Sequence, residues 1–363
     1  MTTTPNQELV RNALRSVDDP ELHKDLVSLD MVRNIHVDGD SVQVEIELTT
    51  PACPLKSQIE EDVRKAVEQI EGVSTVQVEF SANVRSGPQP ASKFLPGVKN
   101  VIAVGAGKGG VGKSTMALNL AVGLQQFGAR VGLLDADVYG PSIPLMLGIE
   151  DLTPVANSEK RIVVPEAHGI QILSMGFFIE KDQPVIWRGP MLHGAIQQFL
   201  GQAIWGELDY LIIDLPPGTG DVALSLSQSI SMAGGVVVTT PQEVSVIDVR
   251  KAIGMFRKLG IHVLGVIENM SGYVCTGCGH EEDIFGTGGG TEMAKTLDTS
   301  FLGKVPIDPS VRQGGDSGTP SLVSHPNSTS SVAIKKIVQT VAGQISQRSL
   351  LNAESPPVQI NRR

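Results

Sequence analysis

The sequence predicts an α/β fold, with a doubly wound and mostly parallel sheet, preceded by a small α+β domain. Two observations predict it. After residue 98 the chain alternates short, nearly continuous apolar runs with segments of helix length, and buried parallel strands connected by helices give this pattern. Before residue 83 the runs instead alternate apolar and polar residues, which is typical of strands with one face in solvent.

The first 83 residues are expected to form the small α+β domain. Leu55–Ile70 places apolar residues on one face at helical spacing, and the alternating segments on either side of Asp38-Gly39-Asp40 indicate a hairpin. The expected elements, in order, are a helix over Asn6–Ser16, strands over Met31–Val37 and Val42–Leu48, a helix over Leu55–Ile70 and a strand over Val73–Phe80.

A linker over residues 84–98 is expected to separate this domain from a larger one that spans residues 99–347. The segment Ser86–Gly97 holds three prolines and two glycines among few large apolar residues. The larger domain has five apolar runs that are expected to be its strands: Val101–Val104, Val131–Leu134, Tyr210–Ile213, Val236–Thr239 and Val263–Ile267.

Apolar residues from Ile334 to Ile345 recur at helical spacing. Such a helix either packs on the sheet or lies on a membrane surface. We favour packing on the sheet, because Lys335 and Lys336 alone are too few for a lipid-binding face. Residues 348–363 are polar and contain prolines, which predicts a disordered tail.

Charge and cysteine content narrow the class of protein. The formal net charge of −10 argues against a general affinity for nucleic acid. Three cysteines in 363 residues cannot form a disulfide framework, which favours a reducing compartment. Met1–Val10 lacks the apolar core of a signal peptide, and no apolar run approaches the length of a membrane span. We therefore expect a cytoplasmic protein without a nucleic-acid or membrane partner.

A phosphate-binding loop follows the first apolar run of the larger domain. Glycines let backbone N–H groups surround phosphate oxygens, and the N-terminus of the following helix favours the same anion. We expect Lys113 to neutralise the β- and γ-phosphates of ATP and Ser114 to ligate Mg²⁺. The P-loop motif reads Gly107-Lys108-Gly109-Gly110-Val111-Gly112-Lys113-Ser114-Thr115.

Lys108 is a second lysine that an ordinary P-loop does not need. The loop resembles the deviant Walker A class throughout, and this resemblance implies that Lys108 reaches the nucleotide of a partner subunit. The alternative is a solvated charge with no such role. We therefore expect a homodimer with nucleotide between its two copies, and a slow ATP hydrolysis that depends on Lys108.

Acidic residues end two predicted strands at the carboxyl edge of the sheet, where open α/β folds bind their ligands. Asp135 and Asp137 follow one strand and Asp214 follows another. We interpret Asp214 as the Walker B carboxylate, which holds Mg²⁺ directly or through water, and Asp137, rather than Asp135, as the group that positions the attacking water. An aspartate after a strand is also a common helix cap. Gly218 is expected to offer a backbone N–H to the γ-phosphate as a switch.

The base is expected to be adenine. The sequence has no Asn-Lys-x-Asp run of the GTPase type. Asn269 lies at the end of a late predicted strand, and its amide offers both a donor and an acceptor to adenine. The alternative for Asn269 is a turn residue at the end of that strand.

Three longer stretches carry a resemblance to a known family. They are DADVYGPS at Asp135–Ser142, WRGPM at Trp187–Met191 and DLPPGTGD at Asp214–Asp221. They resemble the Mrp/ApbC group of ParA/MinD-related ATPases. This resemblance covers residues 98–345, and it implies a carrier or assembly factor for iron–sulfur clusters. Its cluster would bridge two subunits, and its partners would be a cluster donor and apo-proteins.

The first domain carries a shorter resemblance, to the small iron–sulfur-assembly domain that is often fused ahead of such ATPases. The stretches that carry it are Asp19-Pro20-Glu21 and TTPACP at Thr49–Pro54. Cys53 immediately precedes a predicted helix, whose N-terminal dipole favours a thiolate. Cys53 is therefore either a reactive, cluster-handling cysteine or a buried structural one.

Cys275 and Cys278 form a CxxC pair in a polar loop just after Asn269. Two thiolates at this spacing can bind one metal, but they supply only half of a four-thiolate site. A two-fold dimer would bring four cysteines together. The ligands suit a 4Fe–4S cluster and Zn²⁺ equally, and the family resemblance favours the bridging cluster. A redox dithiol is a further alternative.

Three functions therefore compete. We favour an iron–sulfur cluster carrier whose ATP cycle controls the binding or release of the cluster. The alternatives are a ParA/MinD-like positioning ATPase without a cluster and an ATP-dependent electron-transfer reductase. The acidic balance disfavours the positioning ATPase. The reductase resembles nitrogenase iron protein, whose cysteines are far apart in sequence rather than in a CxxC pair.

Overall fold

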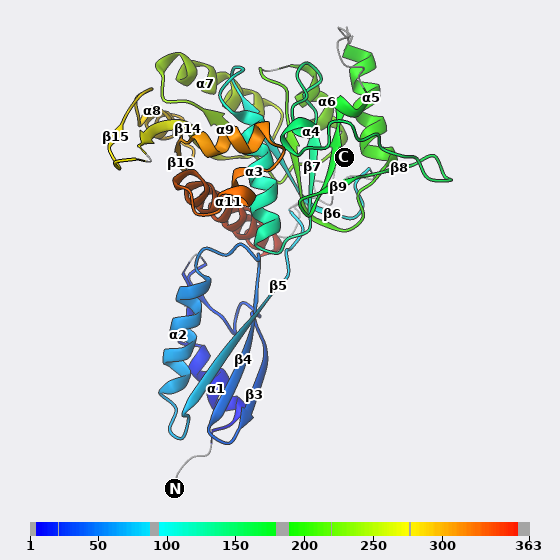
Figure 1. Cartoon of the computed structure of the whole chain (residues 1–363). Helices are drawn as coiled ribbons and strands as arrows, with labels where there is room; N and C mark the ends of the chain where they lie inside the picture. Colours follow the sequence, from blue (N-terminus) through cyan, green and yellow to red (C-terminus); the bar gives the residue numbers. More distant parts are fainter. Residues whose placement is uncertain are drawn as a thin grey trace, which may run out of the picture. The chain divides into compact units, whose positions relative to one another are not determined.

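A computed structural model describes residues 5–20, 22–87, 94–178, 189–218, 220–275 and 277–354. These residues divide into two compact units (Figure 1). One unit holds the residues up to Arg85 and those from Ser346 onward, and the other is Ser86–Ile345. The domain boundaries expected after residues 83, 98 and 347 stay predictions.

The first unit has the α+β architecture that the sequence predicts. Its three-stranded sheet has the order β3-β4-β5, with β3 antiparallel and β5 parallel to β4. Alternate residues of β4, such as Val42 and Val44, are fully buried and pack with the apolar face of α2, which includes Val63. Its main elements are α1 (Gln7–Leu14), β3 (Val32–Asp38), β4 (Ser41–Leu48), α2 (Lys56–Glu68) and β5 (Thr75–Ala82), with the short pair β1 (Asp18–Asp19) and β2 (Lys24–Asp25) between α1 and β3.

The second unit is built on a nine-stranded sheet, as far as its residues are described, and the predicted doubly wound fold is confirmed. The strand order is β15-β14-β13-β6-β12-β7-β10-β9, and β16 also pairs with β14. Only the pairs at the two ends of this path, β14 with β15 and β10 with β9, are antiparallel. The strands are β6 (Val98–Ala106), β7 (Val131–Asp135), β9 (Glu166–Ala167), β10 (Ile170–Ser174), β12 (Leu208–Asp214), β13 (Gly234–Thr239), β14 (Val263–Val274), β15 (Glu281–Glu282) and β16 (Phe301–Ile307).

Helices cover both faces of this sheet (Figure 1). Residues of α5, α6, α7 and α8 share one apolar cluster with inward-facing strand residues, whereas α3 and α11 cover the other face. At Gly123 a Cβ atom would lie 2.6 Å from Val338, so α3 and α11 pack closely. The helices are α3 (Lys113–Gln126), α4 (Ile143–Met146), α5 (Gly189–Gln202), α6 (Asp221–Ser229), α7 (Glu243–Lys258), α8 (Gly289–Thr296), α9 (Pro309–Asp316), α10 (Ser321–Ser324) and α11 (Thr329–Glu354), with a 3-10 turn over Met175–Phe178 and a small pair of strands, β8 (Ile162–Val163) and β11 (Ala203–Ile204).

The end of the chain differs from expectation in one respect. The predicted packing of the last helix on the sheet is confirmed, because Ile337 of α11 contacts β16 at Gly303. However, α11 continues to Glu354, past residue 347, where we expected the tail to begin. Within the described ranges, no helix is both long and apolar enough to cross a bilayer.

Candidate functional site

The phosphate loop connects the central strand β6 to α3, as the sequence predicts. Gly110 and Gly112 have φ angles of 82° and 84°, which L-residues with side chains rarely adopt. Gly107 is required for a different reason. A Cβ atom at this position would lie 2.3 Å from the backbone carbonyl of Asp248, because α7 passes directly beside the loop.

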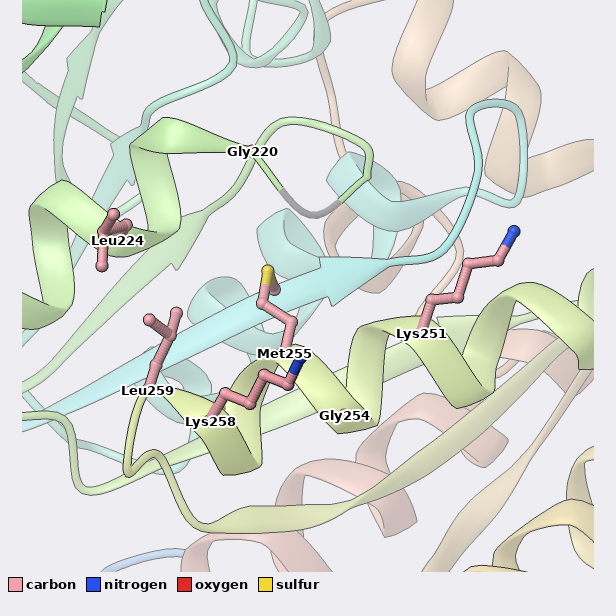
Figure 2. A pocket seen from close by; sticks show the side chains of 7 residues that line it. All are labelled: Gly220, Leu224, Lys251, Gly254, Met255, Lys258 and Leu259. Carbon is pink, nitrogen blue, oxygen red and sulfur yellow. The ribbon is translucent and has the colours of Figure 1, made fainter.

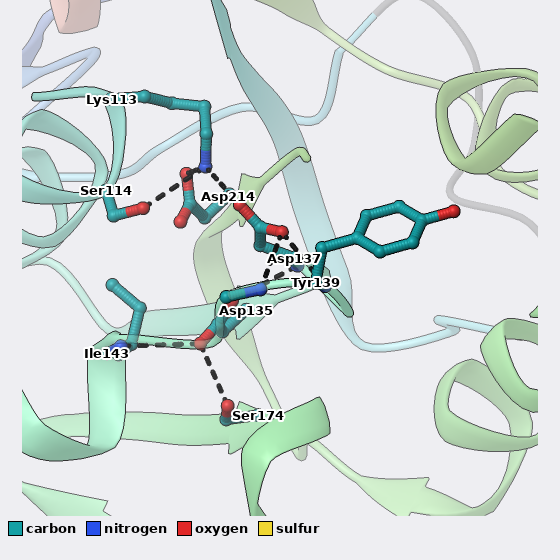
Figure 3. Close-up of polar contacts among 9 residues, drawn as sticks. Lys113, Ser114, Asp135, Asp137, Tyr139, Ile143, Ser174 and Asp214 are labelled. Carbon is teal, nitrogen blue, oxygen red and sulfur yellow. Dashed lines mark hydrogen bonds and ion pairs between the residues drawn. The ribbon is translucent and has the colours of Figure 1, made fainter. Parts of the chain in front are cut away.

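The side chain of Lys113 lies among carboxylates at the start of α3 (Figure 3). Its Nζ atom is 2.6 Å from Oδ1 of Asp214 and 3.4 Å from Oδ2 of Asp137, and it donates a hydrogen bond to Ser114 at 3.1 Å. Lys113 and Asp137 are nearly buried, and Asp214 is completely buried. The structure thus brings together four residues that the sequence assigned to phosphate and magnesium chemistry.

Asp135 is a buried acid whose carboxyl group has an unusually high pKa. Burial and the neighbouring charge of Asp214 raise its pKa to about 7. The carboxylate accepts hydrogen bonds from Ser174 Oγ at 2.9 Å and from the backbone N–H groups of Asp137 and Ile143 (Figure 3). Asp135 therefore organises the loop that follows β7. Ser174 has no motif around it in the sequence, since its contact arises only from the pairing of β10 with β7.

Asp137 serves two purposes at once. Oδ1 accepts hydrogen bonds from the backbone N–H groups of Tyr139 and Gly140, at 3.2 and 3.3 Å, and Oδ2 faces Lys113. These bonds close a turn in the loop after β7 and cap no helix, because α4 begins only at Ile143. Gly218 lies at the end of the adjacent loop with φ 93°, and its N–H donates to the carbonyl of Ala106 at 3.1 Å. To reach a phosphate, this N–H must leave Ala106.

The oxygen atoms at this end of the sheet fit Mg²⁺. Burial raises the pKa of Asp214 despite the nearby Lys113 ammonium. Its Oδ2 atom is buried and accepts no hydrogen bond from the described part of the chain, and a buried carboxylate oxygen without a donor is expected to have a further ligand. Carboxylates and a hydroxyl are the ligands that Mg²⁺ prefers, so Asp214 and Ser114 are suited to hold it.

A cavity of about 380 Å³ opens beside the phosphate loop and is large enough for a nucleoside. Its lining includes Gly112, Thr115, Asn269, Pro306 and Asp308. Asn269 lies within β14, which continues past the strand end that was predicted there, and its Nδ2 atom donates to the backbone carbonyl of Val111 at 2.9 Å. The amide therefore supports the loop, and its expected contact with adenine stays a prediction.

The part of the cavity wall that follows β16 was not predicted from the sequence. Asp308 caps α9 through the N–H of Ser310, at 2.8 Å. Although burial opposes ionisation, hydrogen bonds from Ser330 and Ser310 hold the pKa of Asp308 at about 2. The available signal was Ile307-Asp308-Pro309, an apolar strand end followed by a cap and a proline at the start of a helix.

A larger cavity of about 480 Å³ lies elsewhere, between α6 and α7 (Figure 2). Leu224, Met255 and Leu259 form its apolar lining, with Lys251 and Lys258 beside them. None of the residues predicted for nucleotide or metal binding lines it. Volume alone therefore does not identify the nucleotide site, which is marked by the phosphate loop.

Lys108 projects from the phosphate loop, half-buried. Within the part of the chain that the structure describes, no hydrogen bond or ion pair of its side chain is found. This distinguishes it from Lys113, which has three polar neighbours. Lys108 is thus available for a group outside its own subunit.

Cys275 and Cys278 lie in what we call the cysteine hairpin, residues 273–282, which joins β14 to β15. The N–H of Cys275 donates to the carbonyl of His280 at 2.9 Å, and the N–H of Gly279 donates to Cys275 at 2.8 Å. The sequence suggested a polar loop directly after Asn269, whereas the structure continues β14 to Val274 and closes a tight turn.

The cysteine hairpin favours thiolate chemistry. Backbone N–H groups of Gly277 and Cys278, together with the Cys278 thiol, hold the pKa of Cys275 below its usual range. Neither thiol forms a disulfide, and Cys275 is partly exposed whereas Cys278 is exposed. Among the described residues, no cluster of three or more His, Cys, Asp or Glu side chains is placed to hold a metal. The hairpin thus offers two ligands and lacks the remainder of a four-ligand site.

Known proteins resemble the chain over nearly its whole length. The family model described as ParA, NUBPL iron-transfer P-loop NTPase, matches residues 97–342, and that of an iron–sulfur cluster assembly protein matches residues 7–80. The iron–sulfur cluster carrier protein of Deinococcus radiodurans is 54% identical over 345 residues, which are 95% of this chain and 97% of that protein. The chain belongs to the iron–sulfur cluster carrier family of P-loop NTPases.

Other members of the family and related structures agree with this assignment. The carrier proteins of Synechocystis and Escherichia coli are 49% and 40% identical, covering 95% and 93% of this chain and 99% and 92% of their own. A nucleotide-binding protein of Archaeoglobus fulgidus, solved in complex with ADP, is 39% identical, with a TM-score of 0.56 over 62% of this chain and 89% of that protein. The MinD ATPase of Pyrococcus furiosus, at 24% identity and a TM-score of 0.51 over 67% of this chain and 98% of its own, shows the fold alone.

Some residues singled out in the sequence lie outside the described residues. They are Glu21, Trp187, Arg188, Thr219 and Thr276. Cys53 is described in the first unit, where it is partly exposed and forms no disulfide. Its role stays a prediction.

Proposed function

We propose that two copies of this chain bind ATP and hold one 4Fe–4S cluster between their cysteine hairpins, and that ATP hydrolysis accompanies delivery of the cluster to apo-proteins. The observation that carries the proposal is the incomplete thiol pair, Cys275 and Cys278, on an exposed hairpin. A second copy related by a two-fold axis supplies the same pair again, which completes four thiolates. The family, iron–sulfur cluster carriers, supports iron–sulfur rather than zinc as the cargo.

The nucleotide chemistry is assigned to the residues around Lys113. When ATP binds, the Lys113 ammonium leaves Asp214 and neutralises the β- and γ-phosphates of the nucleotide. Ser114 and Asp214 would hold Mg²⁺, which would supply further positive charge to the phosphates. The carboxylate of Asp137 orients the attacking water, and the loop N–H groups hold the phosphates in place. The Archaeoglobus relative, which was solved in complex with ADP, supports nucleotide binding by this chain.

Lys108 makes this chemistry dependent on the dimer. Its ammonium has no partner among the described residues, and in the proposed dimer it neutralises charge on the nucleotide bound to the other copy. Hydrolysis and closure of the two copies are then linked. The reducing compartment and the cytoplasmic location both stay predictions.

Anaerobic reconstitution of the whole chain with iron and sulfide tests the proposal. We expect absorption and Mössbauer spectra of one 4Fe–4S cluster per two chains, together with a dimer in sedimentation. Cys275→Ala is expected to lose the cluster, whereas Cys53→Ala, a matched loss of a thiol outside the hairpin, is expected to keep it. A Cys275→Ala protein that still holds a full cluster contradicts the proposal, and stoichiometric zinc without iron would assign the pair to zinc.

A further inference from the structure

We propose that Asn269 couples the phosphate loop to the cysteine hairpin within one subunit, so that bound nucleotide changes the environment of Cys275 and Cys278. This inference rests on the proposed function and names the regulation of its cargo site. Asn269 acts as a positioning residue, since its side chain contacts the loop rather than the thiols.

At the phosphate loop the contact is direct and allows little independent movement. The Nδ2 atom of Asn269 donates to the carbonyl of Val111 at 2.9 Å, and the side chain is almost completely buried. A Cβ atom on Gly112 would lie only 2.2 Å from the same Nδ2 atom. The amide therefore packs against two consecutive residues of the loop, and the loop cannot shift at Val111 without moving or losing Asn269.

From Asn269 the chain leads along one strand to Cys275. The strand has an irregular backbone between these residues, because Met270 and Gly272 have φ angles of 56° and 75°. Pairing with β16 also changes register between Asn269 and Tyr273. This part of β14 is therefore held less by regular sheet hydrogen bonds than by its side chains, and it can occupy more than one arrangement.

Glu268, the residue before Asn269, holds the other side of the segment in place. Its buried carboxylate accepts hydrogen bonds from the backbone N–H groups of Gly288 and Gly290 at the start of α8 and from the hydroxyl of Ser271. With β14 fixed to α8 at Glu268, a displacement of Asn269 is transmitted toward the hairpin rather than back into the sheet.

Binding of nucleotide is expected to displace the contact between Asn269 and Val111. Phosphate oxygens attract the loop N–H groups and draw Lys113 away from Asp214, which rearranges the peptide units around Val111. Two sites that share one movable element bias each other equally. A metal or cluster on the thiols should therefore alter nucleotide affinity by the factor by which nucleotide alters metal affinity.

The reactivity of the two hairpin thiols tests the inference without any cluster. The full-length apo-protein is treated with a maleimide, with and without a saturating non-hydrolysable ATP analogue and Mg²⁺, and modification of Cys275 and Cys278 is followed by peptide mass spectrometry. We expect nucleotide to change the rate at which maleimide modifies the two thiols, on the order of fivefold or more. This is the lower range of measured coupling between sites. In Asn269→Ala, the ratio of the modification rates with and without nucleotide is expected to fall to about one, even at nucleotide saturation.

Two controls separate this route from others. Asn119→Ala removes a comparable buried amide, which donates to the carbonyl of Thr115 at 2.8 Å on α3 but does not lie on β14; it should keep the nucleotide effect. Lys108→Ala, expected to stay monomeric with nucleotide, should also keep it, because the route lies within one subunit. An unchanged ratio in Asn269→Ala, its loss in Lys108→Ala, or no nucleotide effect on the thiols of the native chain overturns the inference. Failure of the proposed function is distinguishable, since that appears as absence of a bridging cluster in reconstitution.

Discussion

At the residue scale, the acidic cluster around Lys113 determines how the site responds to charge. Three buried or nearly buried carboxylates, those of Asp135, Asp137 and Asp214, lie near one buried ammonium. Burial, together with the neighbouring charge of Asp214, explains why Asp135 retains its proton to a pKa of about 7. A cation at this end of the sheet would offset the excess of negative charge.

Asp135 should make stability depend on pH. Its pKa in the folded protein, about 7, exceeds the ordinary 3.8, so the folded chain binds the proton more tightly and its stability falls as pH rises from about 4 to about 7. Asp135→Asn removes this contribution of Asp135 to the pH dependence of stability. Relative to the native chain, its free energy of unfolding should increase over that window by up to about 4 kcal/mol and then level off. Urea unfolding at a series of pH values measures this free energy for both proteins. Parallel curves of the free energy against pH would disprove the raised pKa of Asp135.

A second prediction concerns Lys113 as a structural counter-charge. Lys113→Ala leaves the buried Asp214 unpaired and should lower the free energy of unfolding by about 3 kcal/mol in the absence of nucleotide. Adding Asp214→Asn should recover much of this loss. A double-mutant cycle by chemical denaturation gives the coupling energy. Additive effects of the two substitutions would show that the ion pair does not matter for stability.

The sequence identified most residues of this cluster but not their states. Lys113, Ser114 and Asp214 were predictable because a P-loop and a strand-ending aspartate each have a local pattern. The raised pKa of Asp135 and its bond to Ser174 were not, since both depend on the burial and strand pairing that only the tertiary structure supplies.

At the element scale, β14 connects the nucleotide-binding edge of the sheet to the cysteine hairpin. We expected this strand to end near Asn269, because the apolar run stops at Ile267, whereas β14 reaches Val274. The later residues mix polar and apolar side chains and include Gly272 in a left-handed conformation, so the hydrophobic pattern could not reveal them. Strands that are fully buried were predicted best, since their apolar runs are uninterrupted.

The anchor of β14 on α8 gives a prediction at this scale. Glu268→Ala leaves two backbone N–H groups at the start of α8 without their acceptor, and we expect a loss of about 2 kcal/mol in the free energy of unfolding. Glu292→Ala, on the exposed surface of the same helix, should change it by less than about 0.5 kcal/mol. Thermal and urea unfolding of both variants compare them, and equal losses would show that Glu268 has no special role.

At the scale of the whole molecule, the chain joins two units that match two different family models. The fold class of both units was predictable, because the periodicity of the apolar residues changes abruptly between them. The association of two copies was inferred from Lys108 and the cysteine pair, and it cannot be read from one chain's packing, since the groups that complete each site belong to another copy.

Lys108 provides the test at this scale. Lys108→Ala should bind ATP about as well as the native chain but should lose ATP-dependent dimerisation and lower the rate of hydrolysis about a thousandfold, the lower range for removal of such a trans-acting cation. Sedimentation with ATP and phosphate release measure both effects. Lys336→Ala, on the exposed face of α11, should change neither. Native turnover by Lys108→Ala would exclude a role in the other copy's site.

The position of β15 has a consequence for how such proteins diversify. This strand is at the end of the path of the sheet and pairs with β14 only at Tyr273 and Val274. The turn between these strands can therefore be replaced by another turn with the same ends, without altering any strand around the phosphate loop. A P-loop NTPase of this architecture can thus exchange the turn that carries its two cysteines, while the strands around its phosphate loop stay the same.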